Sequence, residues 1–232
     1  IWWAVANKVP RSWRTLSGPA ETFIRTTWKE QGFVQADSIV LKEIPEDSWF
    51  AKVIMYTQEL PYALAVGIPF KNLIEETLHK REVLKKSLTR TDVSEKEREH
   101  YRQELFQVEH TLNECRFVCG HERVHKEHAH TIRMLIIQFI APFVVYSVLK
   151  HSANALDRRQ CAPSFSALLR KGVTRSTIEM LIFWCSAHWY EMQADLHAST
   201  KPEEIEAAIK LFERAHAHKR PLHTQDDLFK MV

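Results

Sequence analysis

The chain has 232 residues, which is long enough to bury one sizeable hydrophobic core. Its acidic and basic side chains nearly balance at a formal net charge of +3, so composition gives no electrostatic footprint for nucleic acid, and we expect no nucleic-acid partner. With only 5 glycines and 9 prolines, and long stretches rich in Glu, Lys, Arg, Leu and Ala, the sequence predicts a predominantly helical α+β fold with a small sheet.

The first segment, residues 1–37, is rich in Trp and Arg and predicts an N-terminal arm with a leading helix between Ile1 and Glu30. Two interpretations stay open for this arm: an amphipathic helix on a membrane, or an arm that packs on the main body. Residues 38–232 are expected to form one domain. Its small sheet is predicted between Ser38 and Phe70, where β-branched and aromatic residues are frequent and prolines interrupt the pattern.

A charged helical hairpin is predicted at about residues 72–110, because apolar residues recur there at helical spacing opposite a charged face. Ser94 and Glu97 have the spacing of a capping box and predict the start of the second helix. From there through His130 the sequence has no proline and only Gly120, so we expect one uninterrupted helix.

Residues 134–149 (MLIIQFIAPFVVYSVL) form an apolar run of about 24 Å as a helix, shorter than a hydrocarbon core of about 30 Å. The run contains Gln138 and Pro142, and it predicts either a buried or interfacial helix or a kinked membrane segment. Beyond it we expect a loop or short helix at 154–174, a helix at 175–199 and a further helix from Pro202 to about His218.

His121, Glu122 and His125 form the pattern H-E-x-x-H on the predicted helix. Positions i and i+4 share one helix face, so both imidazoles can reach one zinc ion, with Glu122 beside the water that the ion binds. A second helix has Glu191 and Asp195 four residues apart. Glu191 can supply the third ligand and leave a fourth position open for water, while Asp195 can orient a ligand imidazole.

Two other metal sites are considered. Cys115 and Cys119 lie too close to His121 and His125 in sequence for a zinc finger. The four cysteines do not cluster like a secreted disulfide framework, and they are interpreted as reduced and buried. His128 lies on the same stripe as His121 and His125, but on a straight helix it is roughly 7–8 Å along the axis from the midpoint of that pair. Since we expect the helix to continue, Glu191 is the predicted third ligand.

These residues resemble the M48 zinc metallopeptidases, the group that contains the CAAX prenyl proteases. The resemblance depends on H-E-x-x-H with His130 nine residues after the first histidine, and on E-x-x-A-D at Glu191, Ala194 and Asp195. It implies a gluzincin-type peptidase domain with the small sheet beside the active-site helix. It also implies apolar helices between the two motifs.

In such a site Glu122 activates the zinc-bound water, and His188 or His223 is the candidate oxyanion stabiliser. The family's substrate-binding edge strand lies upstream of the active-site helix, which here corresponds to the segment YALAVGIPF. Substrates are therefore expected to add a strand there. The residues expected to bind substrate are Tyr62, Ala63, Leu64, Ala65, Val66 and Gly67.

The sequence thus predicts an endopeptidase with one zinc ion per chain, acting on peptide or protein substrates. We expect membrane association, peripheral or integral, through residues 134–149 or a segment before Ile1. The alternative is a non-catalytic, membrane-associated helical scaffold that keeps zinc for folding. Glu122 distinguishes the two, because a purely structural zinc site has no need of a carboxylate beside its first ligand.

Overall fold

The structure, a computed structural model, describes residues 13–45, 57–60, 63–159 and 163–217. The chain divides into two compact units, and each is described by itself. The first comprises residues 1–127 and 194–232, and the second residues 128–193. Helices dominate and one small sheet is present, so the predicted helix-rich α+β class is confirmed. The proposed boundary at residue 37 stays a prediction.

The sheet has four strands: β1 (Arg14–Thr15), β2 (Val40–Glu43), β3 (Thr57–Leu60) and β4 (Ala63–Val66). Their order is β1-β2-β4-β3, with β2 and β4 parallel and the other pairs antiparallel. Strands β2, β3 and β4 lie in the predicted region between Ser38 and Phe70, whereas β1 was not predicted.

The prediction of a free strand edge at Tyr62–Gly67 is wrong. β4 is paired on both sides, for example Ala65 with Lys42 of β2 and with Gln58 of β3, and all four of its residues are buried. An uninterrupted apolar strand such as ALAV fits the centre of a sheet, where both faces are covered, better than an edge. In the described part of the sheet, the edge next to β4 is β3. Tyr62 lies outside the described residues.

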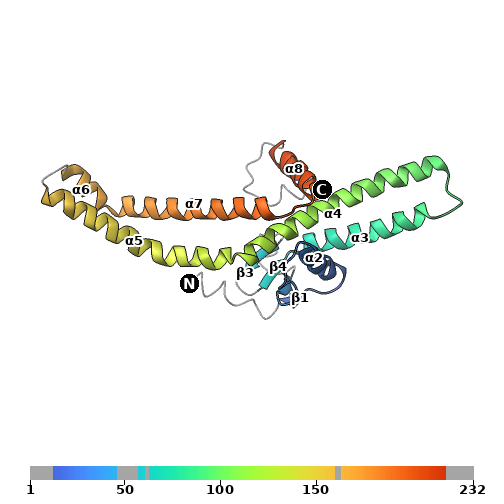
Figure 1. The fold of residues 1–232 in the computed structure, drawn as a ribbon, viewed down its shortest axis with the longest axis horizontal. Helices are drawn as coiled ribbons and strands as arrows, with labels where there is room; N and C mark the ends of the chain where they lie inside the picture. Colours follow the sequence, from blue (N-terminus) through green and yellow to red (C-terminus); the bar gives the residue numbers. More distant parts are fainter. Residues whose placement is uncertain (1–12, 46–56, 61–62, 160–162, 218–232) are drawn as a thin grey trace. The chain divides into compact units, whose positions relative to one another are not determined.

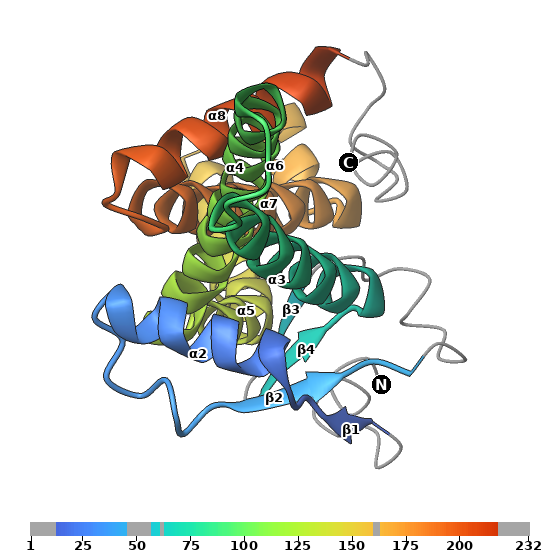
Figure 2. The ribbon, with the colours of Figure 1, turned by 90° about the vertical axis from the view of Figure 1, so that its right-hand side faces the viewer.

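The core of the first unit lies between this sheet and three helices: α2 (Pro19–Glu30), α3 (Ile68–Leu88) and α4 (Glu95–Glu127). Figure 2 shows α2 beside α3, α4 and β2. Trp28, Phe70, Ile74 and Leu112 are fully buried there, each contributing about 1.5–3 kcal/mol by leaving water. The indole of Trp28 also donates a 2.7 Å hydrogen bond to the carbonyl of Cys119, which ties α2 to α4.

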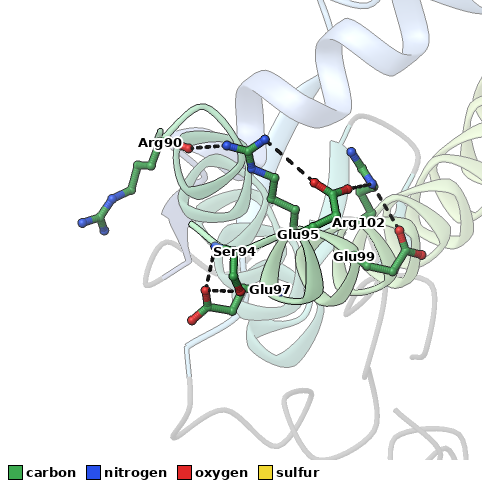
Figure 3. A network of polar contacts seen from close by, with 7 residues as sticks. Arg90, Ser94, Glu95, Glu97, Glu99 and Arg102 are labelled. Carbon is green, nitrogen blue, oxygen red and sulfur yellow. Dashed lines mark hydrogen bonds and ion pairs between the residues drawn. The ribbon is translucent and has the colours of Figure 1, made fainter. Parts of the chain in front are cut away.

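The predicted charged hairpin consists of α3 and α4, which run side by side (Figure 1). The predicted capping box is present: the Glu97 amide donates to Ser94 Oγ at 3.3 Å, and the Ser94 amide donates to Glu97 Oε2 at 2.9 Å (Figure 3). The hydrogen bond from the Ser94 hydroxyl lowers the pKa of the Glu97 carboxyl. These contacts satisfy amides that have no partner inside the helix, and so fix where α4 begins.

The prediction that this helix continues through His130 is wrong. α4 ends at Glu127, and Ala129 has the left-handed conformation at φ 51° and ψ 42° before α5 (His130–Arg158) begins. A non-glycine residue there costs roughly 1–2 kcal/mol. The burial of His130, which is 2% exposed and stacks on Tyr190 at 4.5 Å between ring centroids, offsets part of this cost.

The second unit comprises all of α5, α6 (Pro163–Leu169) and most of α7 (Gly172–His197). With 29 residues, α5 is about 43 Å long, so the apolar run lies inside a longer helix than predicted. Only His130, Val145 and Ala153 of α5 are buried, which contradicts the interpretation as a buried core helix. Among the described helices, α5 is the one long and apolar enough to cross a membrane.

The chain returns to the first unit near the end of α7 and continues into α8 (Pro202–Ala217), which packs along α4. Phe117 of α4, Ala198 and Ala208 form a small buried cluster between them. Arg214 of α8 also pairs with the buried Glu114 of α4. The segment between α7 and α8 is therefore held against the part of α4 that precedes His121.

Candidate active site

The last turns of α4 contain His121, Glu122 and His125. His121 and His125 are four residues apart, about one helical turn, and Glu122 directly follows His121. The Nε2 atoms of His121 and His125 are 3.0 Å apart, and the ring centroids are 4.7 Å apart. Two nitrogens bound tetrahedrally to zinc at about 2.0–2.1 Å are roughly 3.4 Å apart, so this separation is close to that of a metal-bound pair. This face of the helix is buried: Val124 is fully buried and His125 is only 8% exposed.

Asp195 of α7 orients the first histidine. Its Oδ1 lies 2.9 Å from Nδ1 of His121. A carboxylate at this position accepts a hydrogen bond from Nδ1–H. The proton then stays on Nδ1, so Nε2 of His121 has a lone pair that can bind a metal ion. The hydrogen bond therefore fixes both the tautomer and the direction of the ring.

Glu191 precedes Asp195 by one turn on α7. Ligand atoms of His121, His125 and Glu191 all lie within 4.8 Å of one another. Two imidazole nitrogens and one carboxylate oxygen form the donor set of a catalytic zinc site that keeps a fourth position open. The residues present therefore fit a zinc ion.

Gly120, directly before His121, allows the backbone after α7 to approach α4 closely. A Cβ atom at Gly120 would lie 1.8 Å from the carbonyl oxygen of Ala198 and 2.9 Å from Nε2 of Gln31. Only a residue without a side chain fits there. In the sequence Gly120 is the one glycine of the long predicted helix, and an isolated glycine in a helix is a signal for a close backbone approach.

Arg123 provides a second link between α4 and the end of α7. Its Nη2 donates a 2.7 Å hydrogen bond to the carbonyl of His197, and its Nη1 pairs with Glu127 at 2.7 Å. The last carbonyls of a helix have no partner within the helix, so a guanidinium is a favourable partner for them. Arg123 thus holds the end of α7, two residues after Asp195. No local pattern in the sequence indicates this role for Arg123.

A buried polar cluster fixes the turn from α7 to α8. Glu204 is 1% exposed and accepts hydrogen bonds from the Ser199 hydroxyl and from Nε2 of Gln31, the latter at 3.3 Å. The Lys201 amide donates to Ser199 Oγ at 3.0 Å, so the turn is linked both to α8 and to the residue after α2. These hydrogen bonds connect the segment that follows Asp195 to two other parts of the first unit.

The other predicted site residues do not join the three-ligand group. His128 is exposed and stacks on His130, at 5.6 Å between ring centroids. His188 is exposed on α7 and stacks on Trp184, at 5.1 Å between ring centroids. His223 lies outside the described residues.

The two cysteines of α4, Cys115 and Cys119, are free thiols buried in the core, as predicted. Burial raises the pKa of Cys115 to about 12 and raises the pKa of Cys119 well above its ordinary value. A thiol that stays protonated at neutral pH is a poor metal ligand. Cys185 is exposed on α7, so the prediction of a buried thiol is wrong for this residue.

A comparison with protein-family models matches residues 34–217 to peptidase family M48. The chain belongs to peptidase family M48. The matched segment includes both motifs, and the resemblance inferred from H-E-x-x-H and E-x-x-A-D is confirmed. Comparisons with curated proteins and with solved structures gave no match. Membership of family M48 places the chain among the metalloproteases, and the group of His121, His125 and Glu191 is compatible with the zinc that M48 peptidases require.

Proposed function

We propose that this M48 protein is a zinc-dependent endopeptidase in which His121, His125 and Glu191 hold one zinc ion per chain. The observation that supports this proposal is the convergence of three ligand atoms within 4.8 Å, with Glu122 adjacent to the first ligand. Zinc in a site of this kind polarises a carbonyl group and acidifies water.

The chain's own residues then have separate roles in the reaction. Glu122 accepts a proton from the attacking water and delivers it to the leaving amine, which completes the cleavage of the peptide bond. Asp195, through its contact with Nδ1 of His121, keeps that ring in the orientation needed for binding. His188 or His223 donates a hydrogen bond to the oxygen that becomes negatively charged as the carbonyl is attacked.

An extended substrate requires a strand edge, and β3 replaces β4 in this role. β3 is the outer described strand next to β4 and contacts α4, the helix that bears the histidines. Main-chain pairing with β3 would hold a peptide in an extended form with little demand on its sequence. We propose peptide and protein segments in extended conformation as substrates.

We also propose that the protein contacts a membrane through its second unit. Large apolar side chains are exposed along α5 and α7, among them Phe143 at 74%, Met180 at 65% and Trp184 at 59%. Aromatic residues of this kind are favoured at membrane interfaces. Exposed apolar side chains in such number are typical of a surface that contacts a partner or a membrane.

The test of the peptidase proposal is Glu122→Gln, measured by zinc content and by cleavage of casein. Zinc content should stay at about one per chain because Glu122 is not a ligand, while the cleavage rate should fall about 10²–10⁴-fold. Glu109→Gln, a matched change on the same helix, should retain both properties. Equal cleavage by the Glu122→Gln variant would place the catalysis elsewhere. A zinc-loaded wild type without peptidase activity would favour the scaffold alternative.

A further inference from the structure

The second unit contains a basic cavity lined by residues of α5 and α7 and of the end of α6 and the turn after it, none of which is among those proposed to hold zinc. Its volume is about 360 Å³. The lining includes four cationic side chains and no carboxylate: Lys150, Arg170, Lys171 and Arg175. Tyr146, Leu149 and Leu169 supply its aromatic and apolar walls.

Tyr146 holds two of these cations close together. The Lys150 ammonium lies 5.6 Å from the centroid of the Tyr146 ring, and the Arg175 guanidinium lies 5.5 Å from the same centroid. Each cation is attracted to the ring, but two like charges near one ring repel each other. An anion in the cavity would relieve this repulsion.

The surrounding carboxylates neutralise only part of the charge. Asp157 pairs with Arg170, and Glu179 pairs with Arg175. Neither Lys150 nor Lys171 has an ion pair with a carboxylate of the described residues. The first turn of α7 also has no acidic residue, although the positive end of a 26-residue helix favours one. The cavity therefore has an unbalanced positive charge at a helix N-terminus, the arrangement that binds phosphate groups.

The surface around the cavity indicates where that phosphate comes from. Exposed apolar side chains lie within a few residues of its lining in the sequence of all three helices, with Val148 at 56%, Phe165 at 52% and Val173 at 76% exposed. A basic cavity next to exposed apolar surface is complementary to a lipid, whose headgroup is charged and whose chains are apolar. A free phosphate ion would leave the apolar surface uncovered.

We propose that this cavity binds the phosphate group of an anionic phospholipid, with the acyl chains lying against the exposed apolar side chains of α5, α6 and α7. Lys150 and Lys171 supply the uncompensated charge, and Tyr146 organises Lys150 and Arg175 around the phosphate. The inference rests on the proposed membrane contact and is independent of the peptidase chemistry.

The test uses the full chain and flotation with two kinds of vesicle: pure phosphatidylcholine, and phosphatidylcholine with phosphatidylglycerol. The double variant K150Q/K171Q should lose about 30-fold in affinity for the anionic vesicles, since each basic residue near such a surface contributes about fivefold. Its affinity for neutral vesicles should stay unchanged. The control K86Q/K96Q removes the same charge from two exposed lysines of the α3–α4 hairpin and should keep the affinity of the wild type.

A charge-neutral variant tests the geometry of the cavity. Tyr146→Leu keeps every cation but removes the ring that organises two of them, so it should weaken binding to anionic vesicles several-fold. Circular dichroism and zinc content check that each variant is folded. Equal affinities of the wild type and K150Q/K171Q for anionic vesicles, or an equal loss in K86Q/K96Q, would overturn the assignment of the cavity.

Two further outcomes separate the possible failures. If the wild type floats with neither kind of vesicle, the membrane contact itself is wrong. If the wild type binds inorganic phosphate in this cavity but shows no preference for the anionic vesicles over the neutral ones, the cavity takes free phosphate and the lipid assignment is overturned.

Discussion

Replacing Gly120 with alanine tests whether the close approach of α4 to the segment after α7 positions the zinc site. The new methyl carbon would lie 1.8 Å from the Ala198 carbonyl oxygen and 2.8 Å from its carbonyl carbon. Carbon–oxygen contacts are ordinarily about 3.3–3.6 Å, so the backbone at Ala198 has to move by roughly 1.5 Å. Asp195 lies three residues before this point and would move with it.

Two opposing effects decide the stability of this variant. Alanine is favoured over glycine inside a helix by about 1 kcal/mol, so helix propensity alone predicts a more stable protein. Overpacking costs about 1–3 kcal/mol, and a backbone atom that must be displaced belongs at the upper end of that range. We therefore expect Gly120→Ala to lower the free energy of unfolding by about 2 kcal/mol.

The displacement should also affect the metal site. Loss of the 2.9 Å contact between Asp195 and His121 should weaken zinc binding about 10–100-fold, and the misplaced ligands should lower kcat/KM by about 100-fold. Gly172→Ala is the matched control, because a Cβ there has no atom within 4 Å. Zinc titration, peptide cleavage and urea unfolding measure the three quantities. A Gly120→Ala variant that is more stable than the wild type and binds zinc normally would refute the reasoning.

The remaining predictions concern ligands and thiols. Glu191→Ala should lower zinc affinity by orders of magnitude while His128→Ala barely changes it, and the reverse order in a zinc titration would exchange their assignments. Asp195→Ala should weaken zinc binding about 10–100-fold without abolishing it, as a ligand substitution would. At pH 8 iodoacetamide should label Cys185 rapidly and Cys115 hardly at all, because burial raises the pKa of Cys115 to about 12; equal labelling in the folded protein would contradict that burial.

Local patterns determined several features of this protein correctly. The capping box at Ser94 and Glu97 depends on residues three positions apart, and the H-E-x-x-H motif depends on the pitch of a single helix. The family also follows from short motifs, and the match over residues 34–217 agrees with them. Each of these inferences needs only contacts between near neighbours in the sequence.

Two predictions failed because they depend on distant contacts. Helix propensity favours a continuous helix past His125, but the chain takes the left-handed conformation at Ala129, where His130 is buried against Tyr190, 60 residues later in the sequence. The apolar pattern of Ala63–Val66 identifies a buried strand, but only the pairing with both β2 and β3 reveals that it is central.

The candidate site divides in the same way. The sequence by itself predicts which side chains are candidates to bind zinc, because ligand chemistry and helical spacing are local properties of the two motifs, and the grouping of His121, His125 and Glu191 is compatible with that prediction. Only the tertiary structure decided how Asp195 reaches His121, since that contact depends on Gly120 leaving room for the Ala198 backbone and on Arg123 holding the last turn of α7. The lack of a side chain at Gly120 and the hydrogen bond between Arg123 and His197, 74 residues apart, leave no periodic pattern in the sequence. The roles of these residues therefore become visible only in the tertiary structure, where the distant segments are in contact.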